Sequence, residues 1–212
     1  MKVLPFAIAA GLLAAAATSQ AQQASNASAF QVRGEPKLVL TMQQTPTFNV
    51  SGPKDKRVTP LEWLEIEVEM DVQVAPANKA GFIDEITGDF YVVVEDVSTG
   101  KPVMLNDKIT FIDVNARDKK AWLVGYVAPA TLAKFLNKEK PSTNDIKMAA
   151  VVITGPGMVA PKKDEDVAAV MSGSAKDFWK SASVAKKAGM VLPKSKTVFA
   201  PLWGDRHPHT KD

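Results

Sequence analysis

The sequence contains no cysteine, and its two histidines, His207 and His209, both lie close to the C-terminus. Without cysteine the chain has no disulfide, thiol nucleophile or cysteine-based zinc site, so its stability must come from packing. We expect residues 204–212, which end in DRHPHTKD, to be a disordered tail rather than a metal site. A Ser-His-Asp triad in the core is excluded, because no other residue supplies the imidazole base.

Other features of enzymes and nucleic-acid-binding proteins are also missing. There is no Gly-x-Ser-x-Gly elbow, and Gly155-Pro156-Gly157 lacks the helix and lysine of a phosphate-binding loop. The formal charge of +3 provides no basic surface for nucleic acid. We expect no catalytic residue, cofactor or metal, although the 23 acidic residues leave a carboxylate-only hydrolase open.

The N-terminus indicates export. A positive charge precedes an apolar run over residues 3–17, and the small residues Ser19 and Ala21 form an A-x-A-like cleavage site. We expect a signal peptide over residues 1–21 and a flexible leader over residues 22–35, with a retained anchor helix as the alternative. No later run reaches the roughly 18 apolar residues of a transmembrane helix. The processed chain is therefore expected in the periplasm, or associated with the outer membrane or cell surface.

What the remaining sequence does contain is a period-two pattern. Residues 64–74 alternate strictly between apolar and polar side chains, which predicts a long strand with one buried and one wet face. Further strands are expected at residues 37–42, 47–50, 90–95, 109–114, 121–127, 147–154 and 197–202. Residues 118–120 are predicted to form a hairpin tip. The spacing favours one mainly β domain over residues 36–203, an immunoglobulin-like antiparallel β-sandwich with one to three short helices; a barrel is the competing architecture.

Two regions are expected to be helical. Residues 129–137 begin with proline and place Leu132, Phe135 and Leu136 on one stripe. Residues 162–188 change composition to Ala, Lys, Asp and Val and predict a helical insertion, with surface helices at 164–171 and 175–187.

The four tryptophans are scattered along the chain. We expect Trp122 and Trp203 in the core. Trp179 follows Phe178 on a lysine-rich segment and is the best candidate for an exposed contact.

The wet face of the long predicted strand carries an acidic row, Glu65, Glu67, Glu69 and Asp71. Alternate residues of a strand lie about 7 Å apart, too far for neighbours to chelate one ion. A solvated face is the simpler interpretation, and contact with a basic partner surface is the functional one. The candidate partner-binding residues are therefore these four acids together with Trp179.

Three segments carry a resemblance to a known family: residues 62–69 (EWLEIEVE), 90–96 (FYVVVED) and 122–127 (WLVGYV). Together they resemble a small verrucomicrobial family of secreted pilus-like proteins encoded among type IV pilus assembly genes, and the resemblance spans residues 31–203. It implies an immunoglobulin-like sandwich and a role in pilus-associated assembly or adhesion, and it supplies no catalytic residues. The chain lacks a prepilin cleavage site, which favours an accessory or surface component over a polymerising subunit.

We therefore expect a non-enzymatic envelope protein, a type IV pilus-associated structural or adhesion component that acts by protein–protein contact. Its expected partners are pilus-machinery or other envelope proteins, with host glycans or surface proteins as further candidates. The main alternative is a periplasmic ligand- or carbohydrate-binding module, which would show a concave pocket with convergent polar groups.

Overall fold

The computed structural model describes residues 29–47, 60–159 and 167–211. The expected signal peptide, residues 22–28 of the expected leader and most of the expected strand at 47–50 lie outside the described residues. Among the described residues, no helix is long and apolar enough to span a membrane.

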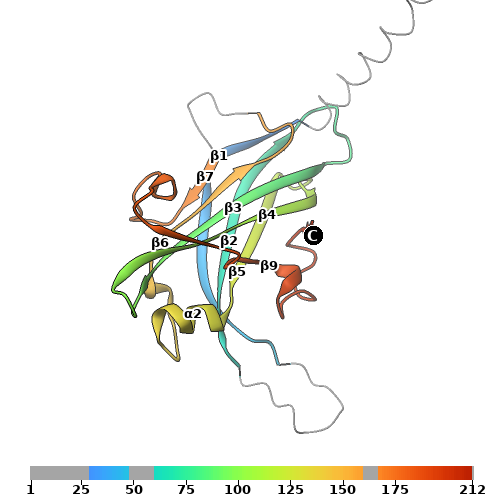
Figure 1. The fold of residues 1–212 in the computed structure, drawn as a ribbon. Coiled ribbons are helices and arrows are strands. Elements are labelled where there is room, and N and C mark those ends of the chain that lie inside the picture. Colours follow the sequence, from blue (N-terminus) through green and yellow to red (C-terminus); the bar gives the residue numbers. More distant parts are fainter. Residues whose placement is uncertain (1–28, 48–59, 160–166, 212) are drawn as a thin grey trace, which may run out of the picture.

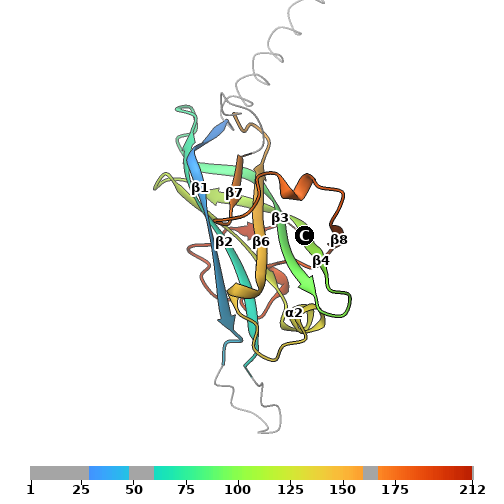
Figure 2. The ribbon, with the colours of Figure 1, turned by 90° about the vertical axis from the view of Figure 1, so that its left-hand side faces the viewer.

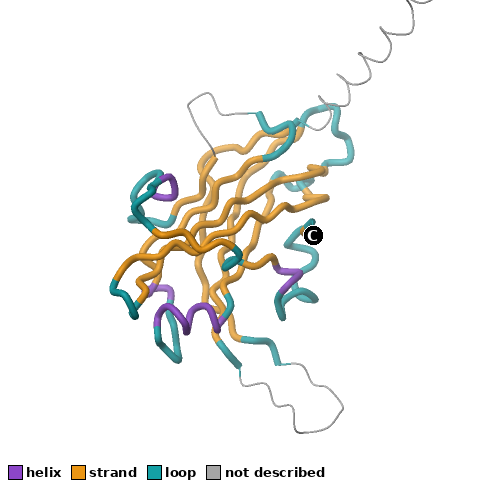
Figure 3. The backbone as a smooth tube through the Cα atoms, viewed as in Figure 1, coloured by secondary structure: helices purple, strands orange, loops and turns teal. Residues whose placement is uncertain are grey.

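Strands dominate the fold and form two sheets (Figures 1 and 3). One sheet has the order β1-β2-β5-β9, and the other has the order β10-β4-β3-β6-β7, with β8 also paired to β4. The strands are β1 (Phe30–Gln44), β2 (Glu62–Val74), β3 (Phe82–Asp96), β4 (Lys101–Asn115), β5 (Lys120–Val127), β6 (Ile146–Thr154), β7 (Val167–Val170), β8 (Ala185–Ala188), β9 (Leu192–Pro193) and β10 (His209–Thr210). All pairs are antiparallel except β4 with β8. The two sheets pack as an immunoglobulin-like sandwich, which confirms the expected fold class.

The alternation in β2 explains how the core forms. Its even-numbered residues, Leu64, Ile66, Val68, Met70 and Val72, are all at most 1% exposed and face the other sheet. Residues 90–94 of β3 and 121–127 of β5 supply much of the opposing and neighbouring apolar surface. A period of two thus places every second side chain between the sheets.

The predicted amphipathic helix is present as α2 (Pro129–Leu136), which ends at Asn137 in the left-handed region with φ 49°. Leu132, Phe135 and Leu136 are buried in the main core, as the stripe predicted. The other helical turns within the described ranges are three short 3-10 segments, Thr143–Asp145, Phe178–Lys180 and Lys194–Lys196.

Several expected boundaries are wrong. β1 begins at Phe30, inside the expected leader, because Phe30 is 1% exposed and anchors the strand in the core. Residues 118–120 do not close a hairpin: β4 and β5 belong to different sheets, so this connection crosses between them. A short turn between two strands does not determine whether they pair with each other.

The region expected to be a helical insertion is also different. Its described part contains the strands β7 and β8 and a single 3-10 turn at Phe178–Lys180. The expected strand at 197–202 is a series of turns. These residues extend around the sandwich (Figure 2) and pack on existing sheets, and this tertiary packing outweighs their local helical propensity.

Residues 190–211, called here the C-terminal segment, close one side of the sandwich. Val191 is fully buried in the main core, β9 pairs with β5 of one sheet, and β10 pairs with β4 of the other. Between β9 and β10 the segment crosses the outer face of the four-stranded sheet (Figure 1). The expected disordered tail is therefore ordered through residue 211.

Candidate functional site

The acidic row of β2 lies on the outer face of the four-stranded sheet, as the alternation predicted, but three of its four carboxylates are held by internal contacts. Glu65 is only 7% exposed. The hydroxyl of Tyr126 on β5 donates a hydrogen bond of 2.8 Å to its Oε2 atom, and Gln43 on β1 donates one of 3.3 Å to its Oε1 atom. Burial raises the pKa of the Tyr126 hydroxyl, and the hydrogen bond to Glu65 raises it further.

Glu67 binds two side chains of the C-terminal segment. Arg206 donates two hydrogen bonds to it, of 2.9 Å from Nε and 2.6 Å from Nη2, and His207 Nε2 lies 2.8 Å from its Oε2 atom. Burial on its own raises the pKa of Glu67, but the hydrogen bonds from His207 and Arg206 outweigh it and lower the pKa to about 2. Glu67 is thus ionised at neutral pH, so the Nε2–H group of His207 donates to it.

The last two acids lie toward the end of the strand. Glu69 is ion-paired with Lys120, whose hydrogen bond lowers the pKa of the Glu69 carboxyl. Asp71 is exposed, and it lies between Arg33 of β1 and Lys120 of β5 in the sheet register. Of the four acids, Asp71 is thus the one most accessible to a partner.

Trp179 is buried, so the expectation that it is exposed is wrong. It is 6% exposed, stacks on Tyr91 with ring centroids 6.2 Å apart, and meets Phe178 edge-on. These aromatic residues cover an apolar cluster on the outer face of the six-stranded sheet. A partner would reach Trp179 only if this covering segment moved away.

The expected core positions of two other tryptophans are wrong as well. Trp122 lies half-buried on the outer face, with the guanidinium of Arg206 4.9 Å from its ring centroid. Trp203 is 43% exposed. The core residue of this region is Phe199, 1% exposed, which stacks on Tyr126 at a centroid distance of 4.8 Å.

The sequence patterns therefore did not identify the C-terminal segment as part of this site. The ring of His207 is 2% exposed, and its contact with Glu67 joins residues that are 140 positions apart in the sequence. The available signal is chemical: Arg206 and His207 follow an aromatic cluster, and both side chains can donate hydrogen bonds to the acidic row. No periodicity marks this pairing.

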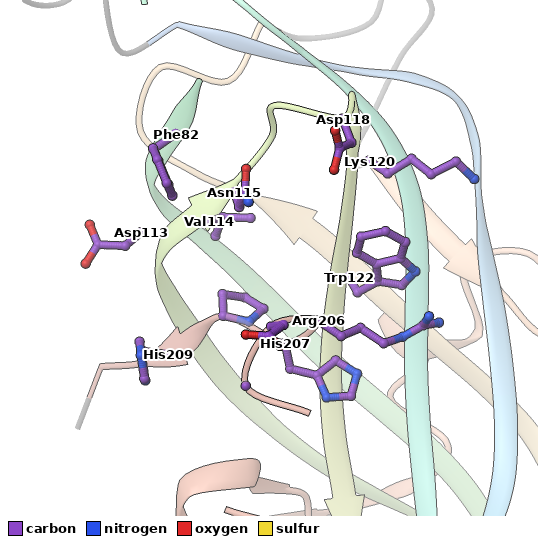
Figure 4. A pocket seen from close by; sticks show the side chains of 13 residues that line it. Phe82, Asp113, Val114, Asn115, Asp118, Lys120, Trp122, Arg206, His207 and His209 are labelled. Atoms are coloured by element: carbon purple, nitrogen blue, oxygen red, sulfur yellow. The ribbon is translucent and has the colours of Figure 1, made fainter. Parts of the chain in front are cut away.

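A cavity of about 350 Å³ lies where the C-terminal segment meets the end of β4 and the start of β5 (Figure 4). Phe82, Asn115, Asp118 and Trp122 line one part of it, and residues 204–209 line another. Two buried nitrogen atoms of residues that line it, Nε1 of Trp122 and Nδ1 of His207, have no hydrogen-bond partner among the described residues. Among the described residues, no hydroxyl or thiol side chain lines the cavity.

In the described part of the chain, no group of three or more histidine, aspartate or glutamate residues is placed to hold a metal ion.

The free edge of β1 is the second candidate surface. β1 is 15 residues long and pairs on one side with β2. On its other side, within the described ranges, β1 has a bridge from Phe30 to Met158 at the start of the strand, and β7 lies close to β1 without pairing with it. The other strands at sheet ends, β7, β9 and β10, are two to four residues long. A long open edge can accept a further strand.

Comparisons with known proteins agree with this architecture. A protein-family model matches residues 21–212, nearly the whole chain. The chain is similar to a crystal structure from Akkermansia muciniphila, with 25% identity and a TM-score of 0.72, over 86% of this chain and 95% of that chain. A search of curated proteins finds no match. The structural match is to a verrucomicrobial protein, as the sequence resemblance implied.

Proposed function

The chain belongs to the family whose model matches residues 21–212, and on that premise we propose that it is an exported, non-enzymatic envelope protein that acts by protein–protein contact. The observation that carries the proposal is the open edge of β1. Residues 38–44 of this strand are hydrogen-bonded to β2 on one side, and among the described residues no strand is paired with them on the other. Backbone groups along such an edge bind a partner strand by main-chain hydrogen bonds.

The proposal extends to the setting in which this contact is made. The three segments that resemble the verrucomicrobial pilus-like family, together with the structural similarity to a verrucomicrobial protein, support a structural or adhesion role beside type IV pilus assembly. The expected location is the periplasm or the outer-membrane surface.

Photo-cross-linking in intact cells tests this proposal. A photoreactive residue at Gln44, exposed at the end of β1, is compared with one at Lys101, exposed at the start of β4. We expect cross-links from Gln44 to pilus-assembly or other envelope proteins, including further copies of this chain, and none of these from Lys101. Equal capture from both positions, or capture from neither, contradicts the proposal.

The cavity at the C-terminal segment supports a second candidate function, a ligand- or carbohydrate-binding module. Its volume of about 350 Å³ is within the range of small-molecule sites, and polar and aromatic side chains, among them Asn115, Asp118 and Trp122, line it. The Asn115 amide can donate and accept and the Asp118 carboxylate can accept, and a sugar hydroxyl can do both.

Saturation-transfer NMR with neutral mono- and disaccharides tests this second function. The expected signal disappears in Asn115→Ala, which removes a polar cavity-lining side chain, and persists in Trp179→Phe, which lies on the other sheet. The absence of saturation transfer from every sugar contradicts it.

A further inference from the structure

We infer that the uncharged half of β1, Leu38 to Gln44, pairs antiparallel with the same half of β1 in a second copy of this chain. The inference rests on the proposed function, since it names an occupant for the edge that was proposed there as a contact surface.

The two halves of β1 differ in how the edge is protected. In the first half, Arg33, Glu35 and Lys37 are charged and exposed, and the register with β2 shifts between Arg33 and Lys37. Pro36 lies within the same irregular stretch. Charges, proline and bulges are the devices by which proteins prevent pairing at sheet edges. In the second half all of them are absent, and the sequence carries no charge from Leu38 as far as Pro53.

The second half also leaves apolar side chains incompletely covered. Leu38, Leu40 and Met42 face the core, opposite Val68, Ile66 and Leu64 of β2. Their partners on β2 are fully buried, but these three residues remain half-buried at the open edge. A strand added to this edge would cover them with its own inward-facing side chains.

Pairing with a second copy covers these apolar side chains and keeps each residue of β1 on the face of the sheet that it already occupies. When the two-fold axis passes through Thr41, Leu40 faces Met42 of the other copy on the inner side, and Val39 faces Gln43 on the outer side. Thr41 lies opposite Thr41 of the second copy. Every pair joins residues of the same parity, so the apolar set of both chains stays inside.

Charge also favours this arrangement. With the axis at Thr41, Lys37 lies opposite the uncharged Thr45, so no like charges face one another. An axis at Lys37 would place two lysines opposite each other. The pairing is isologous and closes as a dimer, because each copy uses the same edge. A seven-residue strand pair is a small interface, so we expect the dimer to depend on concentration.

Because the chain has no cysteine, disulfide trapping tests the register directly. In Thr41→Cys the two thiols face each other across the axis, where directly opposite residues have Cα atoms about 4.5–5.5 Å apart. That separation suits a disulfide. The matched control is Val39→Cys, two residues away on the same face and also half-buried, whose thiols would lie roughly 13 Å apart along the strand.

Purified protein is oxidised over a concentration series up to the millimolar range and examined by non-reducing electrophoresis. We expect at least a tenfold excess of disulfide dimer in Thr41→Cys over Val39→Cys. Equal trapping of both variants, or trapping of neither, overturns the inference.

Sedimentation of the cysteine-free protein provides an independent measurement. The wild type should show a concentration-dependent dimer, and Thr41→Lys, which brings two ammonium groups together at the axis, should sediment as a monomer with an unchanged melting temperature. A dimer that persists in Thr41→Lys overturns the inference. If purified protein is monomeric while Gln44 still captures other envelope proteins in cells, self-pairing fails and the proposed function stands.

Discussion

Glu67 and His207 are 140 residues apart in the sequence, yet His207 Nε2 lies 2.8 Å from the Oε2 atom of Glu67. With the paired hydrogen bonds from Arg206, this contact fixes the C-terminal segment across the outer face of the four-stranded sheet. The acidic row is therefore largely an internal docking surface for the chain's own end. Charge reversal of these acids would disturb that internal contact before any partner contact.

The pKa of Glu67 predicts an acid-dependent loss of stability. Its folded pKa of about 2 lies below the ordinary value of 4.5, so its contribution is present above pH 4.5 and is lost as the pH falls toward 2. At pH 7, Glu67→Gln should lower the free energy of unfolding by up to about 3 kcal/mol.

Urea denaturation across pH 2 to 7 measures this effect. The wild type should lose stability between pH 4.5 and 2 more steeply than Glu67→Gln, and the two curves should converge near pH 2. Asp71→Asn, on the exposed end of the same row, is the control and should follow the wild type. If the stability of the wild type and of Glu67→Gln falls in parallel with pH, the lowered pKa of Glu67 is contradicted.

The buried pair of Tyr126 and Glu65 predicts a second effect. Tyr126→Phe removes the hydroxyl that donates to Glu65 and leaves a buried carboxylate without this donor, which should cost about 1–3 kcal/mol. In Tyr126→Phe/Glu65→Leu the buried carboxylate is gone and only the partly exposed Gln43 amide loses an acceptor, so the double variant should be more stable than Tyr126→Phe alone. Chemical denaturation measures the free energy of unfolding of each variant. A double variant less stable than both Tyr126→Phe and Glu65→Leu would contradict this prediction.

A substitution at Gly125 tests how closely Val191 packs against the four-stranded sheet. A Cβ atom at position 125 would lie 2.9 Å from Cγ1 of Val191 and 3.0 Å from the ring of Phe90, both fully buried residues. Gly125→Ala should therefore destabilise the protein by about 1–3 kcal/mol through overpacking. Gly204→Ala is the matched control, since nothing lies within 4 Å of its added Cβ, and its melting temperature should be unchanged.

Removal of residues 204–212 distinguishes a docked segment from a disordered tail. The truncation deletes Arg206, His207 and β10, so we expect the melting temperature to fall by at least about 5 °C. It should also expose Trp122 to solvent, with a red shift of tryptophan emission. An unchanged melting temperature would mean that these residues do not hold the fold.

Sequence patterns predicted the elements that depend on local periodicity. The alternation over residues 64–74 identified both β2 and its buried face, and the stripe of Leu132, Phe135 and Leu136 identified α2 and its docking side. The same patterns failed for the part of 162–188 that the structure describes, where alanine and lysine favour helix but the chain forms β7 and β8. A strand of four residues is too short to show a clear period-two pattern, so the residue composition alone favoured helix there.

By itself, the sequence determined the mainly β class, the inner faces of the long strands, and the lack of cysteine chemistry. These properties follow from residue types and from spacing within a single element. Only the tertiary structure decided which strands share a sheet, and which outer faces are covered: Phe178 and Trp179 cover one, and Phe199 and His207 cover the other. Such contacts join segments that are distant along the chain and lack regular structure. Their free energy comes from burial and from paired charges, and these exist only once the sandwich has formed.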